Sequence, residues 1–361
     1  MRILQVIASL QKAAGTSTFC GEVSNQLIVC GHEVVIATCN PSEDDCVSLN
    51  PKIRCCSVRS LLLKKGYLFK KACFSLVHIH GLWTLDLNRV FRVAYANGIS
   101  VVWSTHGMTL PWAMRHKRWK KLLPWYLYQR RDLLRAALVH CTVDAEARWN
   151  AALGFRRNVV VPLGTNLPED GSLDHEQQVR ASHTLLFVGR IYQVKAIDNL
   201  IRAFQSIPHT GWRLRIVGPD QAGHLAELKL IAGEDVDFVG PKYDEALETE
   251  YWSCDCLALV SHTENFGATV VDALAHGKPV ITGTKTPWQI VAEKGCGWWV
   301  DNKIESLAKA VGEMMALSDD ERRAMGERGR KLVKEKYTWK AVCDAMVEGY
   351  RRILAGNRSA V

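Results

Sequence analysis

Short apolar runs alternate along this chain with longer segments in which apolar residues recur every three or four positions. The first run, residues 2–8, is short and rich in β-branched side chains, which is typical of a buried strand. Residues 19–28 then carry apolar side chains at helical spacing and stop at Gly31, and residues 34–37 form the next apolar run. This order predicts a strand, a helix and a second, parallel strand.

The same alternation continues to the end of the chain. Further strands are predicted at residues 76–79, 100–103, 138–140 and 159–161 and, after a polar stretch at 168–182, at residues 184–188, 214–217, 236–239, 257–260 and 280–281. We therefore expect an α/β fold of two doubly wound, Rossmann-like domains facing a cleft, with residues 1–165 in the first and 166–338 in the second. The helical pattern that begins at Trp339 carries aromatic residues that are large for an exposed tail, so we expect it to pack against the rest of the protein.

Size and composition agree with a soluble enzyme of two domains. The chain has 361 residues, of which 48% are hydrophobic and 23% charged. No apolar run approaches the roughly 18 to 20 residues that a membrane-spanning helix needs. The 12 cysteines are scattered without a CxxC pair, which disfavours a disulfide framework or a zinc site and indicates a reducing, cytoplasmic location.

Charge is distributed unevenly around a net value of +9. Residues 1–165 hold 22 Lys and Arg against 9 Asp and Glu, whereas residues 166–361 hold 24 against 28. The segment from Arg115 to Arg131 has seven Lys or Arg, no acid, and interleaved Trp and Tyr, which is typical of a helix lying on an anionic membrane surface. The alternative is an ordinary surface helix whose aromatic residues belong to the core. Nucleic acid is disfavoured as a partner because no recognised binding module accompanies the segment.

A second basic helix is predicted near that segment, and it carries Lys64, Lys65, Lys70 and Lys71. The first domain as a whole is thus expected to meet an anionic surface or substrate.

The loop after residues 257–260 is the strongest candidate for chemistry. An apolar run ends there, Glu264 and a turn of small residues follow, and a helical pattern then continues to Gly277. Ligands in open α/β sheets bind at the carboxyl ends of strands, which is where this loop lies. Glu264 and Asp272 bracket the turn, so both can face one ligand. The free N–H groups of residues 266–269 at the helix start suit a phosphate or a sugar hydroxyl.

A second candidate loop follows residues 184–188. It contains Gly189, and the cations Arg190 and Lys195 flank the start of the next helix, where a diphosphate could take both charges and backbone N–H groups. The alternative is a pair of solvated surface cations. Neither a Walker loop nor a GxGxxG motif is present, which disfavours ordinary P-loop or dinucleotide binding.

Three histidines near strand ends are further candidates. His106 directly follows a predicted strand and could donate to a sugar oxygen, although a lone histidine is also often structural. His78 and His80 could suggest a metal site, but we expect them to face opposite sides of their strand and therefore not to share a metal. His80 lies nearer the strand end and is the better candidate of the two.

These residues together resemble a known family. The stretch Glu264-Asn265-Phe266-Gly267, with Asp272 and then Gly277 and Pro279, resembles the E-x7-E signature of family 4 retaining glycosyltransferases with the GT-B fold. Gly189-Arg190 followed by Lys195, the pair Pro162 and Gly164, and the tail from Trp339 match the same layout. The resemblance covers essentially the whole chain.

The resemblance implies a role for each matching residue. Arg190 and Lys195 would hold the donor diphosphate and stabilise the leaving nucleotide, Glu264 would contact hydroxyls of the transferred sugar, and Asp272 would hold the ribose. His106 would lie near the donor sugar. The remaining implied positions are Gly189, Asn265, Phe266, Gly267, Ala268 and Thr269 in the donor site and Gly15 and Thr16 in an acceptor-side loop. The tail, residues 339–361, would cross back onto the first domain.

The implied function is a retaining, hexosyltransferase-type glycosyltransferase that uses a UDP- or GDP-linked sugar without a metal or cofactor. Its acceptor would be a glycan or lipid-linked molecule in bacterial-type surface polysaccharide or lipopolysaccharide assembly. The protein would be cytoplasmic and peripheral at the inner face of the cell membrane. The alternatives are a sugar-nucleotide epimerase of similar fold and a non-catalytic GT-B scaffold.

Three positions depart from the family pattern. Asp272 replaces the second Glu and is one methylene shorter. Ala13-Ala14-Gly15 replaces a glycine-rich loop, so that only Gly15 keeps full backbone freedom. Ala196 replaces a glycine after Lys195.

Overall fold

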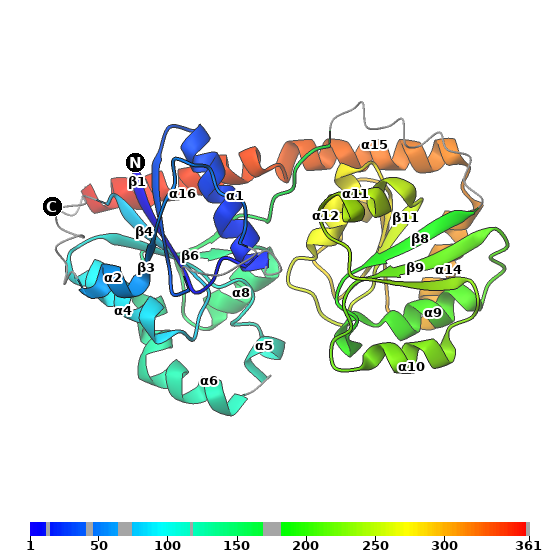
Figure 1. Ribbon diagram of the computed structural model, residues 1–361, viewed down its shortest axis with the longest axis horizontal. Coiled ribbons are helices and arrows are strands. Elements are labelled where there is room, and N and C mark those ends of the chain that lie inside the picture. The colour runs from blue at the N-terminus through cyan, green and yellow to red at the C-terminus, as the bar shows by residue number, and fades with distance from the viewer. Residues whose placement is uncertain (12–14, 41–45, 64–73, 116–117, 169–181, 359–361) are drawn as a thin grey trace. The chain divides into compact units, whose positions relative to one another are not determined.

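The chain divides into two units, each built on one parallel sheet. The computed structural model describes residues 1–11, 15–40, 46–63, 74–115, 118–168 and 182–358. Unit 1 comprises Met1–Leu163 and Trp339–Val361, and unit 2 comprises Gly164–Thr338 (Figure 1). The division falls two residues before the boundary expected from the sequence. The cysteines in the described ranges are free thiols.

Unit 1 contains a seven-stranded sheet in the order β3-β2-β1-β4-β5-β6-β7, in which all neighbours are parallel. Its strands are β1 (Arg2–Ile7), β2 (Glu33–Thr38), β3 (Arg54–Ser57), β4 (Leu76–His80), β5 (Ser100–Ser104), β6 (Leu138–Cys141) and β7 (Asn158–Val160). Its helices are α1 (Gly15–Val29), α2 (Val58–Leu63), α4 (Leu85–Ala96), α5 (Pro111–Arg115), α6 (Arg118–Pro124), the π-helix η1 (Trp125–Gln129), α7 (Arg130–Arg135), α8 (Asp144–Ala152) and α16 (Trp339–Arg358).

Two apolar layers cover the faces of this sheet. One layer joins strand residues such as Ile3 and Val102 to Phe19 of α1 and Met346 of α16. The other layer lies on the opposite face, against α4 and the segment from η1 to α7. The C-terminal helix therefore belongs to unit 1, as the sequence predicted, and α1 and α16 run over the same face of the sheet (Figure 1).

Unit 2 contains a six-stranded sheet in the order β10-β9-β8-β11-β12-β13, again with parallel neighbours. Its strands are β8 (His183–Val188), β9 (Trp212–Val217), β10 (Val236–Gly240), β11 (Cys256–Leu259), β12 (Val280–Gly283) and β13 (Gly297–Val300). Its helices are the 3-10 turn η3 (Gln193–Lys195), α9 (Ile197–Gln205), α10 (His224–Ile231), α11 (Asp244–Ser253), α12 (Ala268–Ala275), α13 (Ile290–Glu293), α14 (Ile304–Ala316) and α15 (Asp319–Lys336).

Both sheets have a topological switch point, where the strand order reverses. The reversal lies between β1 and β4 in unit 1 and between β8 and β11 in unit 2. Open α/β sheets bind ligands beside the carboxyl ends of the strands at such points. In unit 2 the loops that leave β8 and β11 are the two candidate loops found in the sequence.

The sequence missed two strands and simplified one helix. β3 and β13 are edge strands of four residues each, and each is only half-buried or exposed. β3 lacks the continuous apolar run of an inner strand, whereas β13 is a short apolar run that was not predicted as a strand. The basic segment, expected as one helix, consists of α5, α6, η1 and α7. Pro124 ends α6, and because proline has no N–H, the chain continues through a π-helical turn rather than an unbroken α-helix.

Candidate functional site

An ion pair occupies the switch point of unit 2. Lys195 lies in the turn after β8, Glu264 lies in the loop after β11, and Lys195 Nζ is 2.5 Å from Glu264 Oε2. The two side chains are 14% and 16% exposed, so both are largely sheltered yet reach solvent. Ser261 Oγ also donates to Glu264 Oε2, at 3.4 Å. The structure thus brings together two residues that are 69 positions apart in the sequence.

The backbone holds these two loops against each other. The N–H of His262 donates to the carbonyl of Val194 at 2.8 Å, which links the loop after β11 to the turn that carries Lys195. Lys195 is followed by Ala196, whose φ of 51° and ψ of 38° lie in the left-handed region. This conformation is unfavourable for alanine and easy for glycine, which accounts for the glycine usual at this position in the family pattern.

Gly267 shapes the start of α12. Its φ of 81° is left-handed, and a Cβ there would lie 2.6 Å from Leu259 Cδ2 and 3.2 Å from Glu264 Cγ. Only glycine fits this position without displacing its neighbours. The indole N–H of Trp288 donates to the carbonyl of Phe266 at 2.5 Å, which anchors the turn from below. The predicted donor-site positions Asn265 to Thr269 therefore form a tightly supported helix N-terminus, as expected for an anion or hydroxyl site.

Thr269 offers a further polar atom in this turn. Its hydroxyl oxygen is enclosed and has no hydrogen-bond partner in the described part of unit 2. Enclosed hydroxyls are normally satisfied, so a ligand oxygen is a suitable partner.

A second turn that depends on glycine contains Gly189, which the sequence analysis identified, and packs against Gly218, which it did not. Gly189 follows β8, and Gly218 follows the neighbouring β9. A Cβ on Gly218 would fall 1.8 Å from the carbonyl oxygen of Gly189, so the two backbones can pass only because Gly218 has no side chain. Arg190, next in the chain, is exposed, and its Nη1 donates to Gln221 Oε1 at 3.1 Å. The Arg190 guanidinium is thus oriented by the neutral side chain of Gln221, and its positive charge can still interact with an anionic ligand.

Asp272 lies on α12 but in a different environment from Glu264. Its Oδ1 accepts a hydrogen bond of 2.7 Å from Thr165 Oγ1. Burial raises the pKa of Asp272 to about 6, an effect that the Thr165 hydrogen bond and nearby His276 partly offset. At neutral pH this carboxyl therefore keeps its charge less readily than an exposed aspartate does.

In unit 1, the candidate residues lie after β1 and β5. Gly15 begins α1 and is exposed, and a Cβ there would meet nothing within 4 Å, so the described backbone does not require glycine at this position. Thr16 follows it in the first turn. Ala13, Ala14 and the lysines 64, 65, 70 and 71 lie outside the described residues.

His106 occupies a strained turn directly after β5. Its φ of 48° is left-handed, which is uncommon for a residue with a side chain and is concentrated at functional sites. The turn is held by Glu146 of α8, a fully buried carboxylate. Glu146 Oε1 accepts hydrogen bonds from Thr105 Oγ1, at 2.6 Å, and from the N–H of Gly107.

The same carboxylate is satisfied on its other side. Glu146 Oε2 accepts from the N–H of Thr142 at 2.8 Å and from the Thr142 hydroxyl at 3.0 Å. Sequence reasoning missed Glu146, because the donors Thr105 and Gly107 lie 41 and 39 positions away, and the nearby Thr142 forms no recognised motif with it.

The expectation that His78 and His80 face opposite sides of their strand is wrong. Their ring centroids are 4.1 Å apart, because residues i and i+2 of a strand point to the same side. Both rings are buried, in the layer between the sheet and the helices α1 and α16. His80 is thus not a surface-facing candidate, but its Nδ1 lies 3.2 Å from His106 Nε2.

Comparison with known proteins identifies the family. The profile of "Glycosyl transferases group 1" matches residues 174–332, and that of "Glycosyl transferase 4-like domain" matches residues 14–164. The chain belongs to the group 1 glycosyltransferases. The resemblance read from the sequence is thereby confirmed.

Curated relatives match only part of their own length. The D-inositol 3-phosphate glycosyltransferase of Mycobacteroides abscessus is 30% identical over 184 residues, which cover 48% of this chain and 40% of that protein. The protein of the same description from Salinispora tropica is 29% identical over 249 residues, covering 63% and 48%. This glycosyltransferase chain therefore spans about half the length of these relatives.

Solved structures share the fold over the whole chain. Sucrose-phosphate synthase from Thermosynechococcus elongatus has a TM-score of 0.73 at 20% identity and covers 99% of this chain and 100% of its own. HepE of Anabaena, solved with UDP, has a TM-score of 0.74 at 14% identity, covering 96% and 99%. WaaG, described as involved in lipopolysaccharide biosynthesis, has a TM-score of 0.68 at 17% identity, covering 96% and 98%. The predicted GT-B fold is confirmed.

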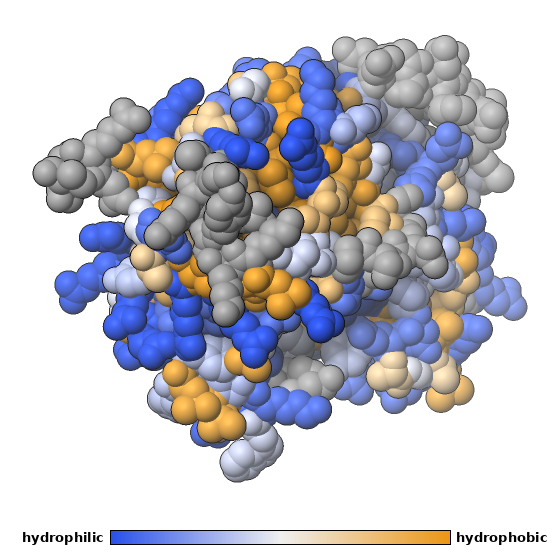
Figure 2. Space-filling model, turned by 60° about the vertical axis from the view of Figure 1, so that its left-hand side comes forward, coloured by the Kyte–Doolittle hydropathy of each residue, from blue (hydrophilic) through white to orange (hydrophobic). Residues whose placement is uncertain are grey.

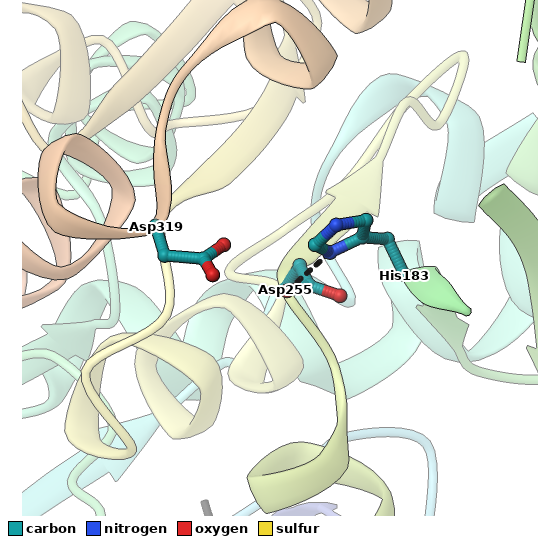
Figure 3. Close-up of side chains that lie close together, drawn as sticks. All are labelled: His183, Asp255 and Asp319. Atoms are coloured by element: carbon teal, nitrogen blue, oxygen red, sulfur yellow. Dashed lines mark hydrogen bonds and ion pairs between the residues drawn. The ribbon is translucent and has the colours of Figure 1, made fainter. Parts of the chain in front are cut away.

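Three side chains that could ligate a metal converge elsewhere in unit 2. His183, Asp255 and Asp319 present one ligand atom each, all within 4.8 Å of one another (Figure 3). His183 and Asp255 lie at the amino ends of β8 and β11, and Asp319 begins α15, whereas Lys195 and Glu264 follow the carboxyl ends of the two strands. Asp319 is paired with the guanidinium of Arg322, whose positive charge opposes a cation there. His183 Nδ1 in turn lies 3.2 Å from Asp255 Oδ1, so each of the three side chains already has a partner within the described part of unit 2.

The basic segment of unit 1 exposes apolar side chains among its cations. Trp119 is 86% exposed, Tyr126 75% and Leu123 66%. Figure 2 shows hydrophobic beside hydrophilic side chains at the bottom of the view, the level at which α6 lies in Figure 1. The exposure argues against the alternative in which all of these aromatic residues belong to the core, although Trp125 and Tyr128 are buried. None of the described helices is long and apolar enough to cross a membrane.

Proposed function

We propose that this group 1 glycosyltransferase transfers a sugar, with retention of configuration, from a nucleotide-diphosphate sugar to a glycan or lipid-linked acceptor. The observation that carries this proposal is the Lys195–Glu264 pair at the switch point of unit 2. Its cation suits the diphosphate, its anion suits sugar hydroxyls, and the two are already adjacent.

Lys195 can serve both partners at once. An ammonium group has three N–H donors, and Glu264 takes one of them, so two remain for phosphate oxygens. As the bond to the sugar breaks, negative charge grows on the departing diphosphate. A cation held in a sheltered place stabilises that charge more strongly than one in open water, and it does so without reorganising. Arg190 adds a second cation on the same loop.

Glu264 has the complementary role. An ionised carboxylate only accepts hydrogen bonds, so it selects hydroxyl groups rather than phosphates. The N–H groups at the start of α12 and the enclosed Thr269 hydroxyl supply the donors that the same sugar or its phosphate would need. No carboxylate in this arrangement is assigned as a covalent nucleophile. Front-face attack, in which the leaving phosphate assists the acceptor hydroxyl, is the mechanism that we propose.

The donor is proposed to be a UDP-sugar, with a GDP-sugar as the alternative. Support comes from HepE, which shares the fold and was solved with UDP and with UDP-glucose. A panel of UDP- and GDP-sugars in a thermal-shift assay tests this choice. A ligand at 100 times its dissociation constant adds about 2.7 kcal/mol to stability, which gives a clear shift. Stabilisation by none of the nucleotide sugars would contradict the proposed function.

Retention and metal independence are tested on the product. With the stabilising donor, NMR of the purified product should show the anomeric configuration of the donor. We expect transfer to continue at an unchanged rate in excess EDTA, because Lys195 and Arg190 supply the positive charge at the leaving group. Inverted product would exclude the proposed stereochemistry, and loss of activity that Mg²⁺ or Mn²⁺ restores would exclude metal independence.

We further propose that the basic segment docks on an anionic membrane surface, which places the protein at the inner face of the membrane beside a lipid-linked acceptor. Cations and exposed aromatic residues occur together on α6 and η1, the combination that binds membrane interfaces. Each cation near an anionic leaflet contributes about 1 kcal/mol. This role belongs with surface polysaccharide assembly, for which the fold of WaaG gives context.

Vesicle co-sedimentation tests the docking. A triple variant, Arg118→Gln, Lys120→Gln and Arg130→Gln, removes three exposed cations of the segment. The matched control, Lys303→Gln, Lys309→Gln and Arg323→Gln, removes the same charge from exposed positions of unit 2. On vesicles rich in phosphatidylglycerol we expect the first variant to lose about 3 kcal/mol of binding, more than a hundredfold, and the control to bind like the wild type. Equal loss in both variants would show that only net charge matters.

A further inference from the structure

A short chain of buried hydrogen bonds ends at His106. Gln5 of β1 lies behind His80 of β4, with Gln5 Oε1 2.7 Å from His80 Nε2. The other nitrogen of the same ring, Nδ1, lies 3.2 Å from His106 Nε2. Gln5 and His80 are 0% and 1% exposed, so water does not compete for these bonds. Within the described part of unit 1, no hydrogen bond occupies the last nitrogen, His106 Nδ1.

The two hydrogen bonds that link His106, His80 and Gln5 run in one direction, with each donor on the His106 side. A carbonyl oxygen only accepts, so His80 must donate to Gln5 from Nε2. A neutral imidazole carries a single N–H, so His80 Nδ1 has none and must accept from His106. The proton of His106 therefore lies on Nε2, and its Nδ1 is left as an acceptor.

The surroundings of His80 and His106 keep both imidazole rings neutral. Burial lowers the pKa of His80 well below its usual value, and the neighbouring histidines lower it further. Burial, with a contribution from His140, lowers the pKa of His106 to about 3. The Phe19 and His106 rings meet in a T-shaped arrangement, with 5.5 Å between their centroids, which adds apolar surroundings to His106.

The backbone of His106 is fixed separately. Glu146 binds the hydroxyl of Thr105 and the N–H of Gly107, the residues on either side of His106. Asn150, one turn further along α8, donates to Thr105 Oγ1 at 3.1 Å. Glu146 and Asn150 therefore fix the left-handed turn, whereas Gln5 and His80 determine which ring nitrogen of His106 carries the proton.

We propose that Gln5 and His80 are positioning residues that hold His106 as its Nε2–H tautomer, so that Nδ1 accepts a hydrogen bond from a substrate hydroxyl. The substrate part of this statement rests on the proposed glycosyl transfer. It reverses the direction expected from the sequence, in which His106 donates to a sugar oxygen. An imidazole nitrogen that accepts can form a hydrogen bond with a hydroxyl group but not with an ether or carbonyl oxygen. The Gln5–His80–His106 network therefore also contributes to substrate specificity.

The tautomer can be measured without any assay of activity. Long-range ¹H–¹⁵N correlation spectra of protein labelled with ¹⁵N-histidine report which ring nitrogen carries the proton, and a His106→Gln sample assigns the signal. At pH 7 we expect His106 to show a protonated Nε2 and an unprotonated Nδ1. A proton on Nδ1, or on both nitrogens, would overturn the proposal, including the case in which the Gln5 amide is reversed.

The role in turnover is tested by two variants in the same core. Gln5→Met removes the acceptor that orients His80 while keeping a side chain of similar length. Thr38→Val is the matched control, because it removes a buried hydroxyl of β2 that donates to the carbonyl of Ala8 at 3.2 Å and has no hydrogen bond to Gln5, His80 or His106 in the described residues. We expect Gln5→Met to mix the His106 tautomers in the spectra and to lower kcat at least tenfold, with KM for the nucleotide sugar changed less than twofold. Thr38→Val should keep both kcat and the tautomer.

The outcomes separate the two proposals. A mixed tautomer with unchanged kcat, or equal losses of kcat in both variants, would reject the positioning role. If no variant and no wild-type sample transfers sugar, the proposed function fails, whereas the spectra still decide the tautomer. If Gln5→Met does not fold, the wild-type spectra still identify the His106 tautomer, and Gln5→Leu tests the effect on kcat.

Discussion

Unit 2 presents charge at its switch point, whereas unit 1 presents neutral rings. Lys195 and Glu264 are partly exposed and neutralise each other, and they are suited to a ligand that brings both charged and hydroxyl groups. In unit 1 the polar side chains His78, His80 and His140 are buried within an apolar layer, and burial holds their pKa values low.

The difference shows two ways in which a fold can orient polar groups for binding a substrate. A charged pair that is partly exposed, such as Lys195 and Glu264, can exchange partners when a ligand binds. Its electrostatic interaction with the ligand is strong because the local dielectric constant is lower than that of water. A neutral network cannot supply charge, but it fixes direction, because each donor and acceptor determines the next. The first arrangement suits stabilisation of a leaving group, and the second suits recognition of one hydroxyl.

The largest effect should come from breaking the charged region on its anionic side. We expect Glu264→Ala to lower kcat about a thousandfold, the scale observed when a preorganised electrostatic partner is removed, while the affinity for the nucleotide stays within a few-fold. Steady-state kinetics and calorimetry check the two parts. A fully active Glu264→Ala protein would contradict the role proposed for Glu264.

Acid should break the neutral region. The pKa of His106 is lowered to about 3 and that of His140 to about 4, and those of His78 and His80 lie well below the usual histidine value, all chiefly because of burial. Above pH 6.5 both folded and unfolded chains carry neutral rings. Below it the unfolded chain takes up protons that the folded chain refuses, so stability falls as pH drops from 6.5 towards 4.

The expected loss is about 1.4 kcal/mol per histidine for each pH unit in that range. Urea unfolding at pH 7.5, 6.5 and 5.5 measures it. A free energy of unfolding that stays constant over this range would show that the histidines titrate normally.

Asp272 should respond to pH with the opposite sign. Its folded pKa, about 6, lies above the ordinary value, so the stability it contributes is present in acid and is lost as pH rises through 6. Asp272→Asn removes this loss and can still accept from Thr165. At pH 8 we expect the variant to be more stable by about 1 to 2 kcal/mol, and at pH 4 to be no more stable than the wild type. A variant that is destabilised at pH 8 would show that the carboxylate is satisfied there.

Ala196→Gly should have the smallest effect. Glycine relieves a left-handed φ that costs alanine about 1 kcal/mol, but it removes a fully buried methyl worth about 0.8 kcal/mol. Because the two nearly cancel, we expect a change below 1 kcal/mol in urea unfolding. A larger loss would mean that the methyl group packs more tightly than its area suggests.

The sequence predicted the inner strands because they are short apolar runs. It missed the edge strand β3, which begins with Arg54 and ends with Ser57, and also β13, because the short apolar run Gly297–Val300 was not recognised as a strand. It placed Lys195 and Glu264 in the same domain from two local motifs. Their contact could not be predicted, because it depends on β8 and β11 being neighbours in the sheet. Glu146 and Gln5 left no signal, since a buried polar residue in a strand or helix is marked only by the partners it meets after folding.

Calorimetric titration of UDP into wild-type protein, Lys195→Met and Arg202→Ala measures directly whether Lys195 binds the donor diphosphate. Arg202 lies on α9, close after Lys195 in sequence, and pairs with Asp198 at the surface, so its removal controls for a lost cation. The double variant Lys195→Met with Glu264→Gln separates lost attraction from the repulsion of an unpaired carboxylate. We predict that Kd rises at least tenfold in both proteins that lack Lys195 and stays within twofold in Arg202→Ala. Unchanged affinity in Lys195→Met would contradict the assignment of this ion pair to the donor diphosphate.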